Sequence, residues 1–203
     1  MQLTDFELAI AQELAKPRET ELLICLNSDG TVEVDRVEGA TDRAELTDLM
    51  RVAMASEGVR LWHNHPSRGS LSSADWRLAV ANVGIRSIAA VNDSGTVFLG
   101  SVKDRSRLDP SLFDDAAGMG EHPLTLPIIT KDSFNDMVHM TFLASHLANQ
   151  QACDDGMICY AAALSDYDQS LWDTAQAEGR TGMAAQAIRE HFQRARSCVR
   201  DQI

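Results

Sequence analysis

The chain has 203 residues, of which 44% are hydrophobic and 24% are charged, and its formal charge is −12; this length allows one domain with an appendage, or two small domains. A chain this acidic, without a basic block, is a poor candidate for nucleic-acid binding, because Lys and Arg side chains that neutralise phosphates supply most of that affinity. It has no run of about 18 apolar residues that would predict a membrane-spanning helix, and its N-terminus lacks the basic-then-apolar pattern of a secretory signal, so we expect a cytoplasmic protein.

The chain begins with a predicted helix and a predicted hairpin. Apolar residues at helical spacing indicate a helix over residues 5–15, which Pro17 ends. Residues 19–27 (ETELLICLN) are typical of a buried strand, and the alternation in residues 31–37 predicts a second strand. The turn residues between them, Ser28-Asp29-Gly30, indicate that the two strands pair as a hairpin.

A helix, a strand and another helix are predicted next. Asp42 and Glu45 stand three residues apart before an apolar series, a spacing that predicts a capping box opening an amphipathic helix, with Gly58 as its end. Residues 59–63 predict a short strand, and a second helix is expected from about residue 73 to residue 83.

Residues 87–91 and 96–102 predict a second hairpin around an Asn-Asp-Ser-Gly turn. The order over residues 1–104 is therefore α-β-β-α-β-α-β-β. Helices interleaved with strands of mixed pairing favour an α/β or α+β sandwich.

The second half of the chain differs in composition. Residues 105–131 contain several prolines and glycines and predict a linker with little regular structure. Three helical stretches are expected after it, at about 132–150, 158–178 and 183–201. The sequence thus predicts an all-helical C-terminal extension over residues 132–203.

The stretch HNHPSRGSLSSAD, residues 63–75, carries the candidate chemistry. His63 and His65 stand at i and i+2 on a predicted strand, so both imidazoles point to one face and can reach one ion. Asp75 lies ten residues beyond His65, in the first turn of the next predicted helix. Two nitrogens and one carboxylate oxygen, with a fourth position left to water, are typical of a catalytic zinc site.

Each part of this stretch also has a purely structural interpretation. The spacing Ser72-x-x-Asp75 is that of a capping box, and an HxH sequence alone is common in chains that bind no metal. The joint pattern, HxHP followed by a short loop and SxxD where a strand passes into a helix, favours the metal site. The four cysteines form no CxxC pair and predict no cysteine-based zinc site.

HxHP followed by SxxD resembles the signature of the JAMM/MPN (JAB domain) metallopeptidases, and HNHPS resembles the RadC-like bacterial branch. The resemblance covers about residues 5–104 and is specific mainly at the motif. It implies a JAB/MPN-like mixed sheet sandwiched by helices, with cytidine-deaminase-like layers, as a metallopeptidase domain over residues 1–104. It also implies one Zn²⁺ per chain bound by His63, His65 and Asp75, with Ser72 stabilising the tetrahedral intermediate.

The family places a glutamate general acid/base at the start of the strand before the first hairpin turn. Glu19, with Asn27 eight residues further on, fits the offset of RadC-like chains. Glu21 is the rival, because residues at i and i+2 share a strand face. We predict Glu19 and keep Glu21 open.

The activity that this resemblance implies is zinc-dependent hydrolysis of a peptide or isopeptide bond, removing a ubiquitin-like modifier or processing a protein tail. The partner would be a protein or peptide substrate, such as a ubiquitin-like conjugate, and the C-terminal helices would be a recognition or docking region. Two alternatives stay open. One is a JAB scaffold that binds with little turnover, and the other, disfavoured by the charge, is a RadC-like DNA-associated factor.

Overall fold

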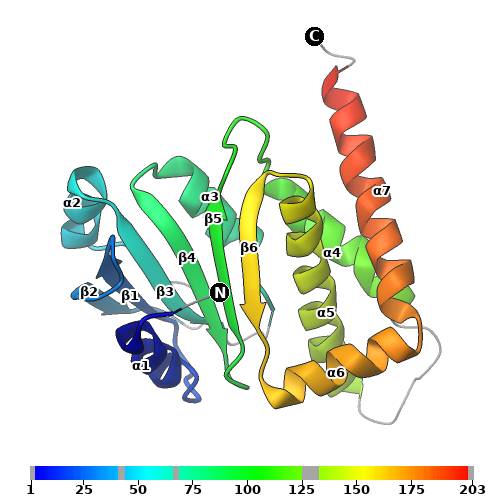
Figure 1. The fold of residues 1–203 in the computed structure, drawn as a ribbon, viewed down its shortest axis with the longest axis horizontal. Coiled ribbons are helices and arrows are strands. Elements are labelled where there is room, and N and C mark those ends of the chain that lie inside the picture. Colours follow the sequence, from blue (N-terminus) through cyan, green and yellow to red (C-terminus); the bar gives the residue numbers. More distant parts are fainter. Residues whose placement is uncertain (1–2, 41–43, 66–68, 125–132, 201–203) are drawn as a thin grey trace.

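The computed structural model describes residues 3–40, 44–65, 69–124 and 133–200, without the side chains of 122–124, 133–138 and 196–200. Its centre is a six-stranded mixed sheet of order β2-β1-β3-β4-β5-β6, with helices on both faces (Figure 1). The strands are β1 Leu22–Asn27, β2 Glu33–Glu38, β3 Val59–His65, β4 Ile85–Asn92, β5 Val97–Val102 and β6 Ile158–Ala163.

The described chain also forms seven helices, so the predicted α/β class is confirmed, while the JAB/MPN-like layering stays a prediction. None of them is long and apolar enough to cross a membrane, as judged on the described residues. They are α1 Asp5–Leu14, α2 Asp48–Ser56, α3 Ser73–Ala81, α4 Ser111–Leu124, α5 Ser133–Asp154, α6 Asp166–Ala177 and α7 Arg180–Arg200.

The pairing of the strands brings one strand end and one helix start together. All neighbouring strands are antiparallel except β3 and β4, which are parallel. Parallel neighbours need a crossover, and α3 supplies it. The carboxyl end of β3 and the first turn of α3 are therefore joined by one short loop.

Each face of the sheet has its own core, because successive strand residues point to opposite faces. Ile24 and Trp62 pack with α1 in the smaller cluster. Leu61 and Phe98 belong to the larger cluster, which includes residues of every other helix. The predicted hairpins and the first helix are confirmed.

Strand β1 begins three residues later than predicted, and Asn64 supplies the reason. The backbone N–H of Leu22 donates to Asn64 Oδ1 at 2.6 Å, and Asn64 Nδ2 donates to the Thr20 carbonyl at 3.1 Å. A side-chain amide thus takes the place of ladder partners and ends the pairing of β1 with β3. Glu19 and Thr20 lie in the bend before the strand.

The capping box predicted at Asp42 and Glu45 is wrong. The N-cap of α2 is Thr47, whose hydroxyl accepts from the Met50 N–H at 3.2 Å and donates to the carboxylate of Asp35. Glu45 precedes the helix, and Asp42 lies outside the described residues. Gly58, at φ 80°, follows the C-cap as expected.

The predicted linker over 105–131 is wrong for residues 111–124, which form α4. Gly120 suggested a loop, yet it serves close helix packing: a Cβ there would lie 2.7 Å from Ile188 Cδ1 on α7. The segment from 125 to 131 lies outside the described residues.

The all-helical extension and the single helix over 158–178 are also wrong. Residues Ile158–Ala163 form β6, which pairs antiparallel with β5, and α6 begins only after the N-cap Ser165. Gly156, at φ 72°, separates α5 from this strand. One sheet and one core cluster therefore extend across residue 104, where the sequence predicted a domain boundary.

Candidate metal centre

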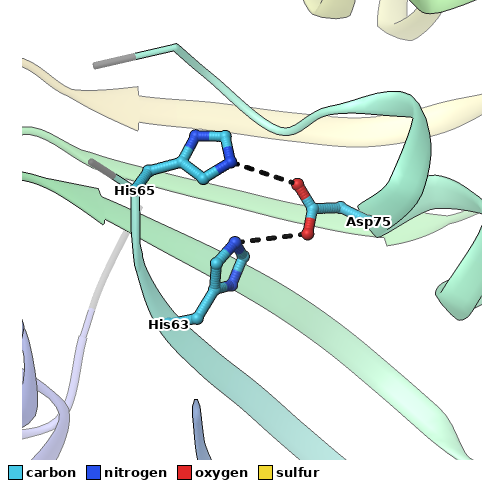
Figure 2. A group of neighbouring side chains, drawn as sticks. All are labelled: His63, His65 and Asp75. Atoms are coloured by element: carbon cyan, nitrogen blue, oxygen red, sulfur yellow. Dashed lines mark ion pairs between the residues drawn. The ribbon is translucent and has the colours of Figure 1, made fainter. Parts of the chain in front are cut away.

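His63 and His65 lie at the carboxyl end of β3 and point to the same face of the sheet (Figure 2). His63 pairs across the ladders with Leu23 and Ala90, both members of the larger core. Its side chain is 3% exposed, whereas that of His65, nearer the strand end, is 16% exposed. The pair therefore sits at the border between core and surface.

Asp75 is oriented by the helix start on which it lies. Ser72 is the N-cap of α3, and its backbone N–H and hydroxyl both donate to Asp75 Oδ2, at 2.7 and 2.8 Å. The Asp75 N–H donates back to Ser72 Oγ at 3.3 Å. The capping box predicted as a structural alternative is present, and it holds the carboxylate toward the histidines.

The three side chains converge. His63 Nε2 lies 3.2 Å from Asp75 Oδ1, and His65 Nε2 lies 3.8 Å from Asp75 Oδ2. One ligand atom from each residue lies within 4.8 Å of the others, and the imidazole rings stand at 89° to each other. The ligand atoms of a tetrahedral zinc ion lie about 3.4 Å apart, close to both His–Asp distances. The group can hold a metal ion.

The second nitrogen of each histidine is fixed by the backbone. The Gly69 carbonyl lies 2.8 Å from His65 Nδ1 and can only accept, so Nδ1 carries the proton. His63 is hydrogen-bonded to the backbone of Ala89. A backbone carbonyl on the far nitrogen is the usual way in which proteins fix the tautomer of a metal-binding histidine. It leaves the Nε2 lone pair of His65 directed at Asp75.

Charge in the group is concentrated on Asp75. Burial would raise the pKa of Asp75, but His63, His65 and the Ser72 backbone hold it well below its ordinary value. Burial would lower the pKa of His63, yet Asp75 raises it, whereas burial and His63 lower the pKa of His65. The site therefore keeps an ionised carboxylate and an unprotonated His65 near neutral pH.

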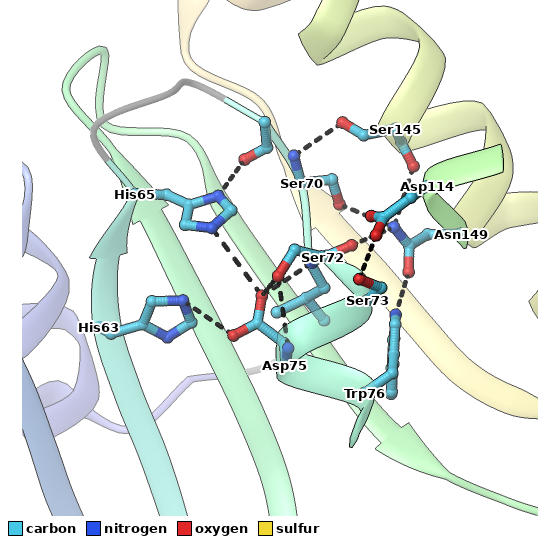
Figure 3. Close-up of polar contacts among 12 residues, drawn as sticks. His63, His65, Ser70, Ser72, Ser73, Asp75, Trp76, Asp114, Ser145 and Asn149 are labelled. Atoms are coloured by element: carbon cyan, nitrogen blue, oxygen red, sulfur yellow. Dashed lines mark hydrogen bonds and ion pairs between the residues drawn. The ribbon is translucent and has the colours of Figure 1, made fainter. Parts of the chain in front are cut away.

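Side chains from the C-terminal half anchor the loop and helix that carry Asp75 (Figure 3). Trp76 Nε1 donates to Asn149 Oδ1 at 2.8 Å, and Asn149 Nδ2 donates to the Leu71 carbonyl at 2.8 Å. The Ser70 N–H donates to Ser145 Oγ at 2.8 Å. No local sequence pattern predicts these supports, because they lie more than 70 residues from the motif in the chain.

The two candidate glutamates lie differently. Glu19 is exposed in the bend before β1. Glu21 is half-buried, exchanges backbone hydrogen bonds with Gly39 and Ala40, and acts electrostatically on His63. Leu23 pairs with His63, and Glu21 stands two residues before Leu23, so continued alternation along the chain would give it the same sheet face.

A small cavity of about 110 Å³ opens beside His65. Lys16 and Arg18 line it together with Asn64 and Asp93. The Nε atom of Arg18 is buried without a hydrogen-bond partner among the described atoms. Solvent or a substrate group can therefore approach His65 from this side.

Comparisons with family models, with curated proteins and with solved structures gave no match for this chain. The geometry of the two histidines, the aspartate and their supports is therefore the basis on which a function is assigned.

Proposed function

We propose that the protein is a zinc-dependent peptidase or isopeptidase whose metal ion is held by His63, His65 and Asp75. The observation that carries this proposal is the convergence of two imidazole nitrogens and one carboxylate oxygen within 4.8 Å, at the border of core and surface. Imidazole and carboxylate ligands suit zinc, and three protein ligands leave a position for substrate or water. The resemblance of HNHPS and SxxD to the JAMM family supports the same reaction.

The bound ion would supply Lewis acidity, polarising a carbonyl group and lowering the pKa of a water molecule. The chain's own contribution is to fix the ligands in advance. Gly69 holds the tautomer of His65, and Ser72 holds the carboxylate of Asp75. Such fixed geometry is what a catalytic site needs, since little reorganisation is left for the reaction itself.

Ser72 has two roles in this proposal. In the structure its hydroxyl donates to Asp75, which orients that ligand. Polarising the substrate carbonyl, the role implied by the family resemblance, requires this hydroxyl to turn from Asp75 toward the substrate. Both roles predict that removal of the hydroxyl impairs the site.

Glu21 is the better candidate for the general acid/base than Glu19. It stands two residues before Leu23, the ladder partner of His63, and acts to raise the pKa of His63. A carboxylate so placed can take a proton from the attacking water and pass it to the leaving amine. Glu19 is exposed and stays a candidate only by its offset from Asn27.

The substrate proposed is a protein or peptide, such as a tail joined to a ubiquitin-like modifier. The cavity beside His65 offers Lys16 and Arg18 to carbonyl or carboxylate groups of such a chain. The sequence has no basic block and its formal charge is −12, which disfavours a nucleic acid as the ligand.

The test combines metal analysis with cleavage assays on peptide and isopeptide libraries. Wild type should bind one zinc ion and cleave. Glu21→Gln should keep the zinc and lose about 100-fold or more in rate, while the matched Glu19→Gln should keep both the zinc and the rate. A loss confined to Glu19→Gln would reverse the base assignment. Iron in place of zinc, or a zinc-loaded wild type that cuts no substrate, would contradict the proposed activity.

A further inference from the structure

A second, larger cavity of about 560 Å³ lies between α5, β6 and α6. These three elements stand side by side at the end of the sheet opposite β2 (Figure 1). The cavity is within the size range of small-ligand sites, ~300–1,000 Å³. Its walls carry His146, Tyr160 and Trp172 together with Gln150, Asp154 and Gln169.

The floor of this cavity is fixed by hydrogen bonds. Tyr160 Oη lies 2.8 Å from His146 Nδ1 and 2.6 Å from Ser70 Oγ. The Trp172 ring stands at 81° to the imidazole of His146, with ring centroids 5.0 Å apart. Aromatic groups held in this way form a pocket before any ligand arrives, which lowers the entropic cost of binding.

The charge of the walls is negative. Asp154 is the only Asp, Glu, Lys or Arg among the described residues that line the cavity. The buried His146 stays uncharged, because burial lowers its pKa to about 4, although Asp168 acts to raise it. From Asp154 to Glu178 the sequence has six acidic residues and no basic one. Asp154, an exposed residue at the end of α5, therefore makes the cavity more suitable for a cation than for an anion.

We propose that this cavity binds a primary alkylammonium group, as carried by a lysine side chain or a small diamine. Asp154 would neutralise the ammonium, and the face of Trp172 would attract it. The side-chain oxygens of Gln150 and Gln169 can accept hydrogen bonds from its remaining N–H groups. The alkyl chain would lie against Ala162 and Leu164.

The cavity is separate from the metal centre but connected to it. Ser70, which hydrogen-bonds Tyr160 in the cavity floor, lies in the loop between His65 and Asp75. An occupied cavity would therefore reach this loop through the hydrogen bond between Tyr160 and Ser70. Binding of the ammonium group does not require the metal ion.

Isothermal calorimetry on the metal-free protein tests the site without reference to turnover. The probes are 1,5-diaminopentane, for a free diamine, and Nα-acetyl-lysine N-methylamide, for a side chain on a polypeptide. Nα-acetyl-norleucine N-methylamide is the uncharged comparison, and glutarate is the anionic one. At least one ammonium probe should bind, and whichever binds more tightly identifies the source of the group.

Asp154→Asn should weaken that binding about tenfold or more. Asp155→Asn removes the same charge from the next residue, which does not line the cavity, and should leave the affinity unchanged. Trp172 fluorescence gives a second readout, because Trp62 and Trp76 are 0% exposed and out of a ligand's reach. Equal binding of the lysine and norleucine probes, no binding of either ammonium probe, or equal effects of the two Asn variants would overturn the proposal.

Discussion

His65 can bind a metal ion through Nε2 because its other nitrogen donates to the Gly69 carbonyl. Asp75 is held in the same way, by the backbone and hydroxyl of Ser72. In both cases a group that is hydrogen-bonded to the ligand fixes the orientation of that ligand. Groups that hydrogen-bond a metal ligand in this way typically contribute a factor of ~10–100 to metal affinity.

Ser72→Ala should therefore weaken zinc binding by about 10–100-fold and lower the free energy of unfolding by about 1 kcal/mol through the lost N-cap. Zinc titration and urea unfolding measure the two effects. Thr47→Ala removes the N-cap of α2, away from the metal centre, and should lower stability without changing zinc affinity. Equal zinc affinity in the two variants would show that Ser72 is only a cap.

The buried His146 is expected to lower the free energy of unfolding in acid. Its folded pKa of about 4 lies below the ordinary 6.5, because burial disfavours the charged ring, against the opposite effect of Asp168. The unfolded chain takes up the proton first, so this contribution to stability is lost as the pH falls from 6.5 toward 4. Between pH 7 and pH 5 the wild type should lose roughly 2 kcal/mol more than His146→Gln, measured by urea unfolding. Parallel pH profiles would contradict this.

At the scale of elements, sequence patterns predicted those helices and strands that local interactions determine. The hairpins and α1 follow from alternation, turn residues and helical spacing. Helix α4 was missed because the prolines and glycines of residues 105–131 predict a linker, whereas Gly120 allows close contact with Ile188 of α7. Strand β6 was missed because ICYAAA has no alternating pattern, and its pairing with β5 is decided only by the assembled sheet.

Alanine substitutions at two glycines, Gly84 and Gly118, separate the effect of close packing from that of helix propensity. A Cβ on Gly84 would lie 1.9 Å from the backbone oxygen of Met54. This oxygen can move away only if the backbone of α2 shifts. Gly84→Ala should therefore destabilise the protein by about 2–4 kcal/mol. Gly118, inside α4, has no atom within 4 Å of such a Cβ, so Gly118→Ala should stabilise it by about 0.5–1 kcal/mol. Thermal unfolding of both variants checks this, and destabilisation by Gly118→Ala would argue against a helix at α4.

Asn149 joins α5 to the start of α3. Asn149→Ala would leave Trp76 Nε1 and the Leu71 carbonyl buried without their partner. We expect a loss of about 2–3 kcal/mol of unfolding free energy and weaker zinc binding, since α3 carries Asp75. Gln151→Ala, two residues further along α5, should change neither. A stability loss with unchanged zinc affinity would separate this support from the metal centre.

At the scale of the whole molecule, the two halves of the chain form one sheet and share the larger core. The three candidate ligands lie within 13 consecutive residues, so the sequence could predict them as a set. Asn149, Ser145 and Tyr160 come from the other half and were not predictable, because only the fold brings them to the loop. The C-terminal half is thus a structural support of the candidate site.

Zinc K-edge absorption of the protein loaded with one equivalent of zinc tests the metal centre most directly. We expect a shell of nitrogen and oxygen atoms at about 2.0–2.2 Å, with scattering from two imidazole rings in wild type and from one in His63→Ala. A sulfur shell at about 2.3 Å, or the same two-imidazole spectrum in His63→Ala, would mean that zinc binds elsewhere and that His63, His65 and Asp75 are not its ligands.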